Sequence, residues 1–145
     1  MLAQHTTCYF DTFIAVAPDS TAESGVAPPV RDPGQLSVAS RTYRMIADAP
    51  YRFTSDEVIF TVWADRRGVP VEERELARVE FFSKGQPCLR ASDLGKRYGW
   101  GVHSDSAGRV ALYAVGTAEY DSFTAGSSPL DGRAVTVKKA MRASR

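Results

Sequence analysis

Apolar residues alternate with other residues in three segments of the chain, as they do in β-strands. The segment CYFDTFIAVA, at 8–17, is apolar on both alternating faces and rich in aromatic and β-branched residues, which predicts a central strand. The segment GWGVHSDSAGRVALYAVG, at 99–116, alternates on both sides of SDSAG and predicts a hairpin. The segment AVTVKK, at 134–139, predicts a last strand.

Residues that can cap a helix precede the segments with helical periodicity. Ser37 can cap a helix that extends to about Ala49, before Pro50. Thr54 and Glu57 form a capping box, in which the hydroxyl accepts from the amide three residues on and the carboxylate reaches back to the cap. Two helix starts are therefore predicted from local signals alone.

Each predicted helix carries a candidate buried face. The second helix would bury four residues, Val58, Ile59, Val62 and Trp63. The acidic start of VEERELARVEFF, at 71–82, suits the first turn of a third helix. That helix would bury three residues, Leu76, Val79 and Phe82. Thr117 can cap a further short helix.

The order of these elements predicts the fold class. Strands surround a block of helices without a regular alternation of strand and helix. This order favours an α+β fold, in which helices pack on one face of a mainly antiparallel sheet. A length of 145 residues indicates a single domain over 1–145. Two segments are set apart, a long proline-rich loop at 18–34 and a basic tail at 139–145.

Composition limits the classes of protein to consider. No apolar run approaches the roughly 18 residues of a membrane span, and the start MLAQHTTCYFDTF lacks the pattern of a signal peptide. The sequence therefore predicts a cytoplasmic protein with no membrane partner, in which Cys8 and Cys88 are reduced. Neither a CxxC pair nor a cluster of histidines and acids is present, so no metal and no cofactor are expected.

Charge is divided unevenly along the chain. Residues 1–82 hold 8 basic and 12 acidic residues, a net −4, and residues 83–145 hold 10 and 5, a net +5, which together give the overall +1. A basic half can attract an anionic small molecule or a nucleic acid. The near-neutral total and the lack of a basic helical stripe argue against nucleic acid, although Tyr98, Trp100 and Tyr113 could stack bases.

The stretch FFSKGQPCLRASDLGKRYGWGVH, at 81–103, concentrates reactive and charged side chains between glycines. Cys88 and His103 are candidate catalytic residues, because a thiol beside basic residues can act as a nucleophile when a histidine lies within hydrogen-bonding reach. The alternatives are a small buried apolar residue for Cys88 and a structural role for His103. The spacing does not decide between them.

The same stretch could also hold an anion. The candidate binding residues are Lys84, Arg90, Ser92, Lys96, Arg97 and Tyr98. Arg90 could grip a carboxylate or phosphate through two N–H groups, and Ser92 could cap a short turn. We therefore expect a small anionic molecule to be bound, or bound and transformed, in a pocket around residues 83–103.

The alternative function is a non-catalytic regulatory or interaction module. It would use the basic C-terminal half to bind an acidic protein or a nucleic acid. Such a module requires four residues on one exposed face, Lys138, Lys139, Arg142 and Arg145. An enzyme instead requires the side chains of Cys88, Arg90 and His103 to converge on one concavity.

Long strings of the sequence resemble a known family. These strings are YFDTFIAVA, YRFTSDEVIF, FFSKGQPCLRAS, KRYGWGVHSDSAGRVALY and KAMRASR, and they cover most of the chain. The family that they resemble consists of short bacterial proteins known only as a domain of unknown function. The resemblance implies a stand-alone bacterial domain and transfers no catalytic residue, cofactor or substrate. Asp93 follows Ser92 where the family has a proline.

Overall fold

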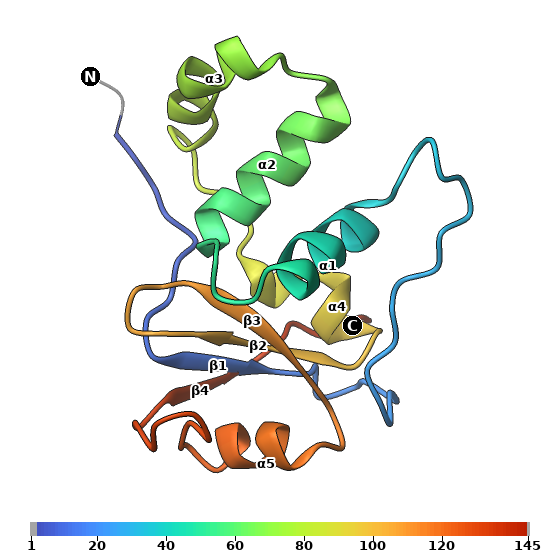
Figure 1. The fold of residues 1–145 in the computed structure, drawn as a ribbon, viewed down its shortest axis with the longest axis vertical. Helices are drawn as coiled ribbons and strands as arrows, with labels where there is room; N and C mark the ends of the chain where they lie inside the picture. The colour runs from blue at the N-terminus through green and yellow to red at the C-terminus, as the bar shows by residue number, and fades with distance from the viewer. Residues whose placement is uncertain (1–2, 145) are drawn as a thin grey trace.

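A single four-stranded sheet forms the centre of the molecule, for which we analysed a computed structural model that describes residues 3–144. The strands are β1 (Thr12–Ala15), β2 (Trp100–Ser104), β3 (Val110–Ala114) and β4 (Thr136–Lys139). Their order is β3-β2-β1-β4, as Figure 1 shows. β2 is antiparallel to β1 and to β3, whereas β4 runs parallel to β1. The mainly antiparallel α+β fold is confirmed.

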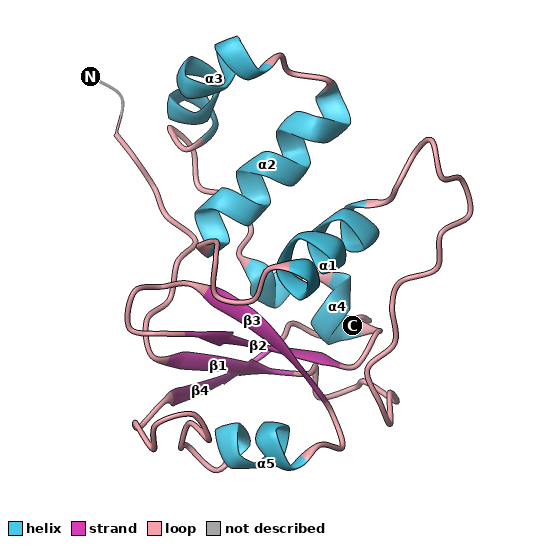
Figure 2. Ribbon diagram, in the orientation of Figure 1, coloured by secondary structure: helices cyan, strands magenta, loops and turns pink. Residues whose placement is uncertain are grey.

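Helices lie on both faces of this sheet. They are α1 (Val38–Asp48), α2 (Ser55–Arg67), α3 (Arg74–Phe81), α4 (Asp93–Lys96) and α5 (Ala118–Thr124), with short 3₁₀ turns at Val71–Glu73 and Leu89–Ala91. In Figure 2, α1, α2 and α4 lie above the sheet and α5 lies alone below it. We expected the helices to share one face. The difference arises because Phe13 and Ile14 of β1 point to opposite faces and both are buried.

The capping residues act as the sequence predicts. The Ser37 hydroxyl accepts a hydrogen bond from the Ser40 amide at 3.1 Å. At the start of α2, the Thr54 hydroxyl accepts from the Glu57 amide at 3.2 Å, and the Glu57 carboxylate accepts from the Thr54 amide at 3.0 Å. Each bond satisfies a backbone donor that the helix itself leaves free, so these helix starts are set locally.

Two apolar cores lie on the two sides of the sheet. The helix-side core is built on nine residues, Ile14, Ala17, Ile46, Val58, Val62, Leu89, Val102, Val110 and Ala140. The α5-side core is built on five, Phe13, Ala15, Tyr120, Phe123 and Val135. In the second core the Phe13 ring stacks on Phe123 at 4.8 Å between centroids and meets Tyr120 edge-on at 5.3 Å. The sheet therefore separates two independently packed regions.

α3 differs most from expectation. Leu76 is 81% exposed and Val79 is also exposed, so they do not form a buried edge, and only Phe82 is buried as predicted. In Figure 1, α3 stands away from the sheet beside the far end of α2. A third small core joins the two helices, in which Phe82 packs with Phe60 and Ala64 of α2. Of the four residues predicted for the buried face of α2, Val58 and Val62 are buried, whereas Ile59 and Trp63 are only half-buried.

The long loop is irregular, as expected, but it is anchored at its middle. The Val26 amide donates to the Tyr98 carbonyl at 3.0 Å, and the Trp100 indole donates to the Val26 carbonyl at 2.9 Å. Gly99 has a φ of +79°, and a Cβ there would collide with the Ser24 carbonyl. The loop therefore packs against the start of β2, and the glycine allows the close approach.

The basic tail is attached to the same loop. The Asp19 carboxylate accepts hydrogen bonds from the Ala143 and Ser144 amides, each at 3.2 Å. Arg145 lies outside the described residues. No helix between residues 3 and 144 has both the length and the apolar character needed to span a bilayer.

Candidate functional site

The stretch 81–103 is divided between the two faces of the sheet. Leu89, next to Cys88, belongs to the helix-side core, whereas the His103 ring lies 4.4 Å from the Phe123 ring of the α5-side core. Cys88 and His103 line two different cavities. They therefore do not form a nucleophile–base pair, and Arg90 lines neither cavity.

The larger cavity is a groove between α1, α2 and residues 86–92, with a volume of about 480 Å³. We call it the helix groove. Its lining residues are Val38, Thr42, Ile59, Val62, Trp63, Arg66, Arg67, Phe81, Gln86, Pro87, Cys88, Leu89, Ala91 and Ser92. Most of this wall is aliphatic, aromatic or small, which is typical of ligand-binding clefts.

Two arginines supply the charge of the helix groove. Among residues 3–144, the only charged residues that line it are Arg66 and Arg67, in the last turn of α2. The Arg67 guanidinium lies over the Trp63 ring at 4.9 Å from the centroid, a cation–π contact that holds it at the groove. Within residues 3–144, neither arginine forms an ion pair. The positive charge at this edge is thus left uncompensated.

Cys88 lies between the helix groove and Tyr9. Its Sγ is 3.4 Å from the Tyr9 hydroxyl, and Lys138 places its ammonium over the Tyr9 ring at 5.7 Å from the centroid. The bond to Cys88, together with burial, raises the pKa of Tyr9 above its usual value. In the described part of the chain, no hydrogen bond joins the Cys88 thiol to a histidine or carboxylate. No general base is therefore in place for this thiol.

Most of the predicted anion-binding residues lie outside the groove. Ser92 is the exception: it lines the groove and caps α4 by accepting from the Leu94 amide at 3.2 Å. Arg90 donates to the Lys139 carbonyl at 2.7 Å, and Arg97 forms an ion pair with Asp93 at 3.5 Å. The other three, Lys84, Lys96 and Tyr98, line neither cavity. Arg66 and Arg67 were not predicted as binding residues, although the pair follows Trp63 at the end of a capped helix.

The smaller cavity, of about 210 Å³, lies on the α5 side beside His103, and we call it the His103 cavity. Its lining residues are Asp11, Tyr51, His103, Asp105, Ser106, Ser128, Leu130, Asp131, Arg133 and Val135. His103 Nδ1 and the Tyr51 hydroxyl are 2.7 Å apart, and the same hydroxyl is 2.7 Å from that of Tyr113. Burial, followed by the bond to Tyr113, raises the pKa of Tyr51.

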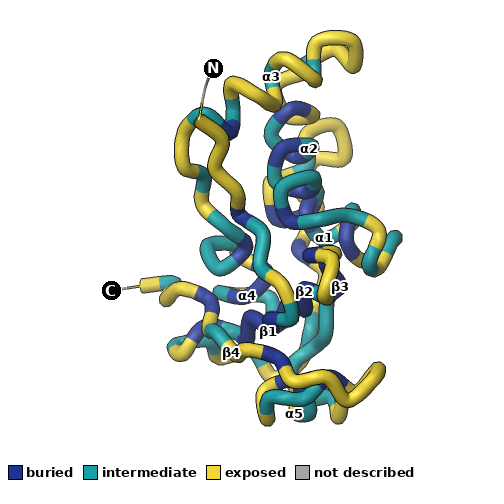
Figure 3. Tube along the Cα trace, turned by 90° about the vertical axis from the view of Figure 1, so that its left-hand side faces the viewer, coloured by how far each residue is buried: buried dark blue, intermediate teal, exposed yellow. Residues whose placement is uncertain are grey.

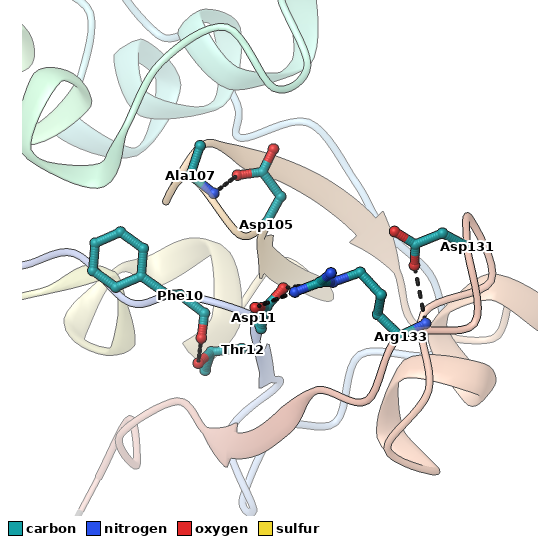
Figure 4. Close-up of polar contacts among 7 residues, drawn as sticks. All are labelled: Phe10, Asp11, Thr12, Asp105, Ala107, Asp131 and Arg133. Carbon is teal, nitrogen blue, oxygen red and sulfur yellow. Dashed lines mark hydrogen bonds and ion pairs between the residues drawn. The ribbon is translucent and has the colours of Figure 1, made fainter.

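Four charged side chains line the His103 cavity, those of Asp11, Asp105, Asp131 and Arg133, and Figure 4 shows their polar contacts. Arg133 forms a two-pronged ion pair with Asp11, with Nη2 at 3.0 Å and Nε at 3.4 Å. The Asp131 carboxylate accepts from the Arg133 amide at 3.0 Å, and the Asp105 carboxylate accepts from the Ala107 amide at 2.9 Å. These residues come from loops that are distant in sequence, so no local motif could have grouped them.

Comparison with known proteins identifies the family of this chain. Residues 4–145 match a family described as a family of unknown function, DUF6157. The chain belongs to DUF6157. No curated protein and no solved structure matches it. Because the description of DUF6157 names no activity, the function of this DUF6157 protein is argued from the two cavities.

Neither cavity offers a metal site. Among residues 3–144 of the DUF6157 protein, no group of three or more histidine, cysteine, aspartate or glutamate side chains is arranged to hold a metal ion. The carboxylates beside His103 are instead engaged with Arg133 and with backbone amides. In both cavities, the groups that could contact a ligand are hydrogen-bonding, charged and apolar side chains.

The stability of the DUF6157 protein is expected to fall as His103 becomes protonated. Burial lowers the pKa of His103, and Asp105, Asp11 and Asp131 oppose this only in part. The unfolded chain then binds a proton at a higher pH than the folded chain does, so the free energy of unfolding decreases as the pH drops below about 6.5. Urea unfolding at pH values of about 7.5 and about 5.5 should show this loss. The loss should be smaller in His103→Gln, and an equal loss in both proteins would contradict the assignment.

Proposed function

We propose that this protein binds a small anionic molecule with an apolar body in the helix groove. The observation that carries the proposal is the composition of the wall, which is largely apolar and whose only charges are Arg66 and Arg67. A ligand with a carboxylate or phosphate at one end matches both properties. The groove, at about 480 Å³, is within the usual size range of small-molecule sites.

Two kinds of interaction would contribute to affinity. The apolar body would bury surface against residues such as Ile59, Phe81 and Leu89, which contributes roughly 25 cal/mol per Å² of apolar area. The acid group would accept paired hydrogen bonds from a guanidinium, which matches a carboxylate or phosphate in geometry. Because no acidic residue lines the groove, no internal carboxylate competes for Arg66 and Arg67.

The proposal is one of binding. Cys88 lines the groove, but the hydrogen-bond partner of its thiol is Tyr9. A bound ligand would cover this thiol, which makes Cys88 a reporter of occupancy. We further propose that the protein is bacterial and cytoplasmic, where Cys8 and Cys88 would stay reduced. Both cysteines are free thiols.

The proposal is tested by matched probes. We expect 3-phenylpropanoate to raise the midpoint of thermal unfolding in a saturable way, and 3-phenylpropanol to do so less, because only the acid can pair with the arginines. A ligand at 100 times its dissociation constant adds about 2.7 kcal/mol of stability. The acid should also slow the alkylation of Cys88 by iodoacetamide, while Cys8, which does not line the groove, serves as the internal control.

Variants locate the site. Arg66→Gln with Arg67→Gln should weaken binding of the acid by about tenfold, which corresponds to about 1.4 kcal/mol. Arg142→Gln removes one positive charge from the exposed tail, outside the groove, and should leave binding unchanged. Equal stabilisation by the acid and the alcohol, or a loss of binding in Arg142→Gln alone, would refute the proposal.

The alternative function, a non-catalytic interaction module that uses the basic C-terminal half, has less support. Lys139 and Arg142 are exposed, but Lys138 is half-buried over the Tyr9 ring. Lys138 and Lys139 also lie on β4, which is an edge strand (Figure 3). Lysines on an edge strand discourage pairing with other chains, which accounts for their position without a partner.

A further inference from the structure

The His103 cavity is lined by a buried histidine that has one unpaired ring nitrogen. The His103 side chain is 4% exposed, and its Nδ1 is bonded to Tyr51. Its Nε2 has no hydrogen bond to any residue between 3 and 144. This atom is also not among the fully enclosed unpaired polar atoms, so it keeps some accessible surface, and the cavity is the open space that His103 lines. A polar atom in this position is costly unless a ligand or water bonds to it.

The carboxylates of the same cavity are only partly satisfied. Asp105 uses Oδ1 to accept from the Ala107 and Arg109 amides, and Asp131 uses Oδ1 to accept from the Arg133 amide. The Oδ2 atoms of Asp105 and Asp131 have no partner within the described part of the chain. The cavity thus presents free acceptors.

The charge of the cavity is negative. Three carboxylates, those of Asp11, Asp105 and Asp131, line it together with one guanidinium, that of Arg133. Both oxygens of Asp11 are bonded to Arg133, so these two charges compensate each other. With His103 neutral, the net charge is −2. An anion would meet two uncompensated carboxylates there and an arginine that is already paired.

From these contacts we propose that the His103 cavity is a second binding site, which takes a small molecule with a primary ammonium group. An ammonium carries three N–H donors and one positive charge. It can donate to His103 Nε2 or to a free carboxylate oxygen of Asp105 or Asp131, all of which belong to residues that line this cavity. The volume, about 210 Å³, equals that of about seven waters at about 30 Å³ each, so the ligand has only a few heavy atoms.

His103 can take the form that an ammonium requires. Its ring must be neutral, with Nε2 unprotonated and Nδ1–H donating to the Tyr51 oxygen, and the Tyr51 hydroxyl then donates to Tyr113. Burial lowers the pKa of His103, which keeps the ring neutral at neutral pH. The other titratable groups facing it are Tyr51, Tyr113, Asp11, Asp105, Asp131 and Arg133. Tyrosines 51 and 113 therefore position the imidazole.

The site is independent of the helix groove, because the sheet lies between the two cavities and no residue lines both. Failure of one proposal leaves the other intact. NMR can observe the His103 cavity directly, since the chain has only two histidines. His5 is exposed and serves as the reference in the same spectra.

The test is a titration at neutral pH and constant ionic strength, followed through the imidazole resonances. Ethanolamine and n-propylamine, both protonated at this pH, should shift the His103 resonances in a saturable way. Ethylene glycol and n-propanol, their neutral counterparts, should not. The absence of a saturable shift with both amines, or equal shifts with the alcohols, overturns the proposal.

Variants then separate a specific site from general charge attraction. Asp105→Asn and Asp131→Asn keep an oxygen for the turn amides but lose the charge, and each should weaken amine binding by about threefold to fivefold. Asp93→Asn removes the same charge from α4, which lies outside the cavity, and should leave binding unchanged. If all three variants bind the amines as the parent protein does, the carboxylates do not hold the ammonium and the proposal is wrong.

Discussion

Phe123→Ala is expected to lower the free energy of unfolding by about 3–5 kcal/mol. The Phe123 side chain is 0% exposed, and it stacks on Phe13 at 4.8 Å and packs against Tyr113 at 4.7 Å. Truncation to alanine loses this burial and leaves a cavity in a small core that is built on five buried residues. Urea unfolding followed by circular dichroism measures the difference.

The matched control is Phe10→Ala, which removes the same ring from a position that is 59% exposed. It should cost less than about 1 kcal/mol. Similar losses in both variants would mean that α5 is not packed as the structure has it. Because the His103 ring lies 4.4 Å from Phe123, the His103 resonances should also move in Phe123→Ala and not in Phe10→Ala.

Gly101→Ala is expected to destabilise the protein by about 1–3 kcal/mol through overpacking. Gly101 lies in β2 beneath the α5-side core, where an added Cβ would collide with the Phe13 ring and lie 2.9 Å from the Tyr120 ring. Neither ring can withdraw easily, since both are buried. The same unfolding measurement tests this prediction.

Gly85→Ala provides the opposite case. An added Cβ at Gly85 meets nothing within 4 Å, and Gly85 is not among the glycines with a positive φ. Alanine there reduces the conformational freedom of the unfolded chain and should stabilise the protein by about 0.4–1 kcal/mol. If Gly101→Ala were as stable as Gly85→Ala, the close approach of β2 to the α5-side core would be disproved.

Elements with complete local signals were predictable from the sequence. The hairpin from Trp100 to Ala114 carries its alternation and its turn within one segment, and the starts of α1 and α2 carry their capping residues. β4 was found from alternation alone. In each case the interactions that decide the element lie within a few residues of one another.

The way in which these elements pack against one another was harder to predict from the sequence. The face that α5 covers depends on contacts between Phe13 and Phe123, which are more than one hundred residues apart. Leu76 is exposed because α3 lies away from the sheet. These outcomes are set by tertiary packing, which residue periodicity does not encode.

The separation of Cys88 from His103 has a simpler physical reason. Neighbouring residues in a strand point to opposite faces, so Val102 and His103 cannot both face the helices. Val102 packs in the helix-side core, which places His103 on the other side, away from Cys88. Proximity in sequence was a poor guide to a shared site. Both cavities are also lined by charged residues from outside the stretch 81–103. These are Arg66 and Arg67 in the helix groove, and Asp131 and Arg133 in the His103 cavity.

The parallel pairing of β4 with β1 affects the order in which the sheet folds and locally unfolds. Thr12 pairs with Thr136, so this contact closes a loop of about 124 residues. Closing such a loop from a flexible chain costs about 4 kcal/mol in entropy beyond a constant term, whereas the hairpin of β2 and β3 closes locally. β4 should therefore join the sheet late in folding and leave it early in local unfolding. Since Arg133 and Val135 precede β4 and line the His103 cavity, part of the wall of that cavity belongs to the segment that closes the longest loop among the three strand pairings of the sheet.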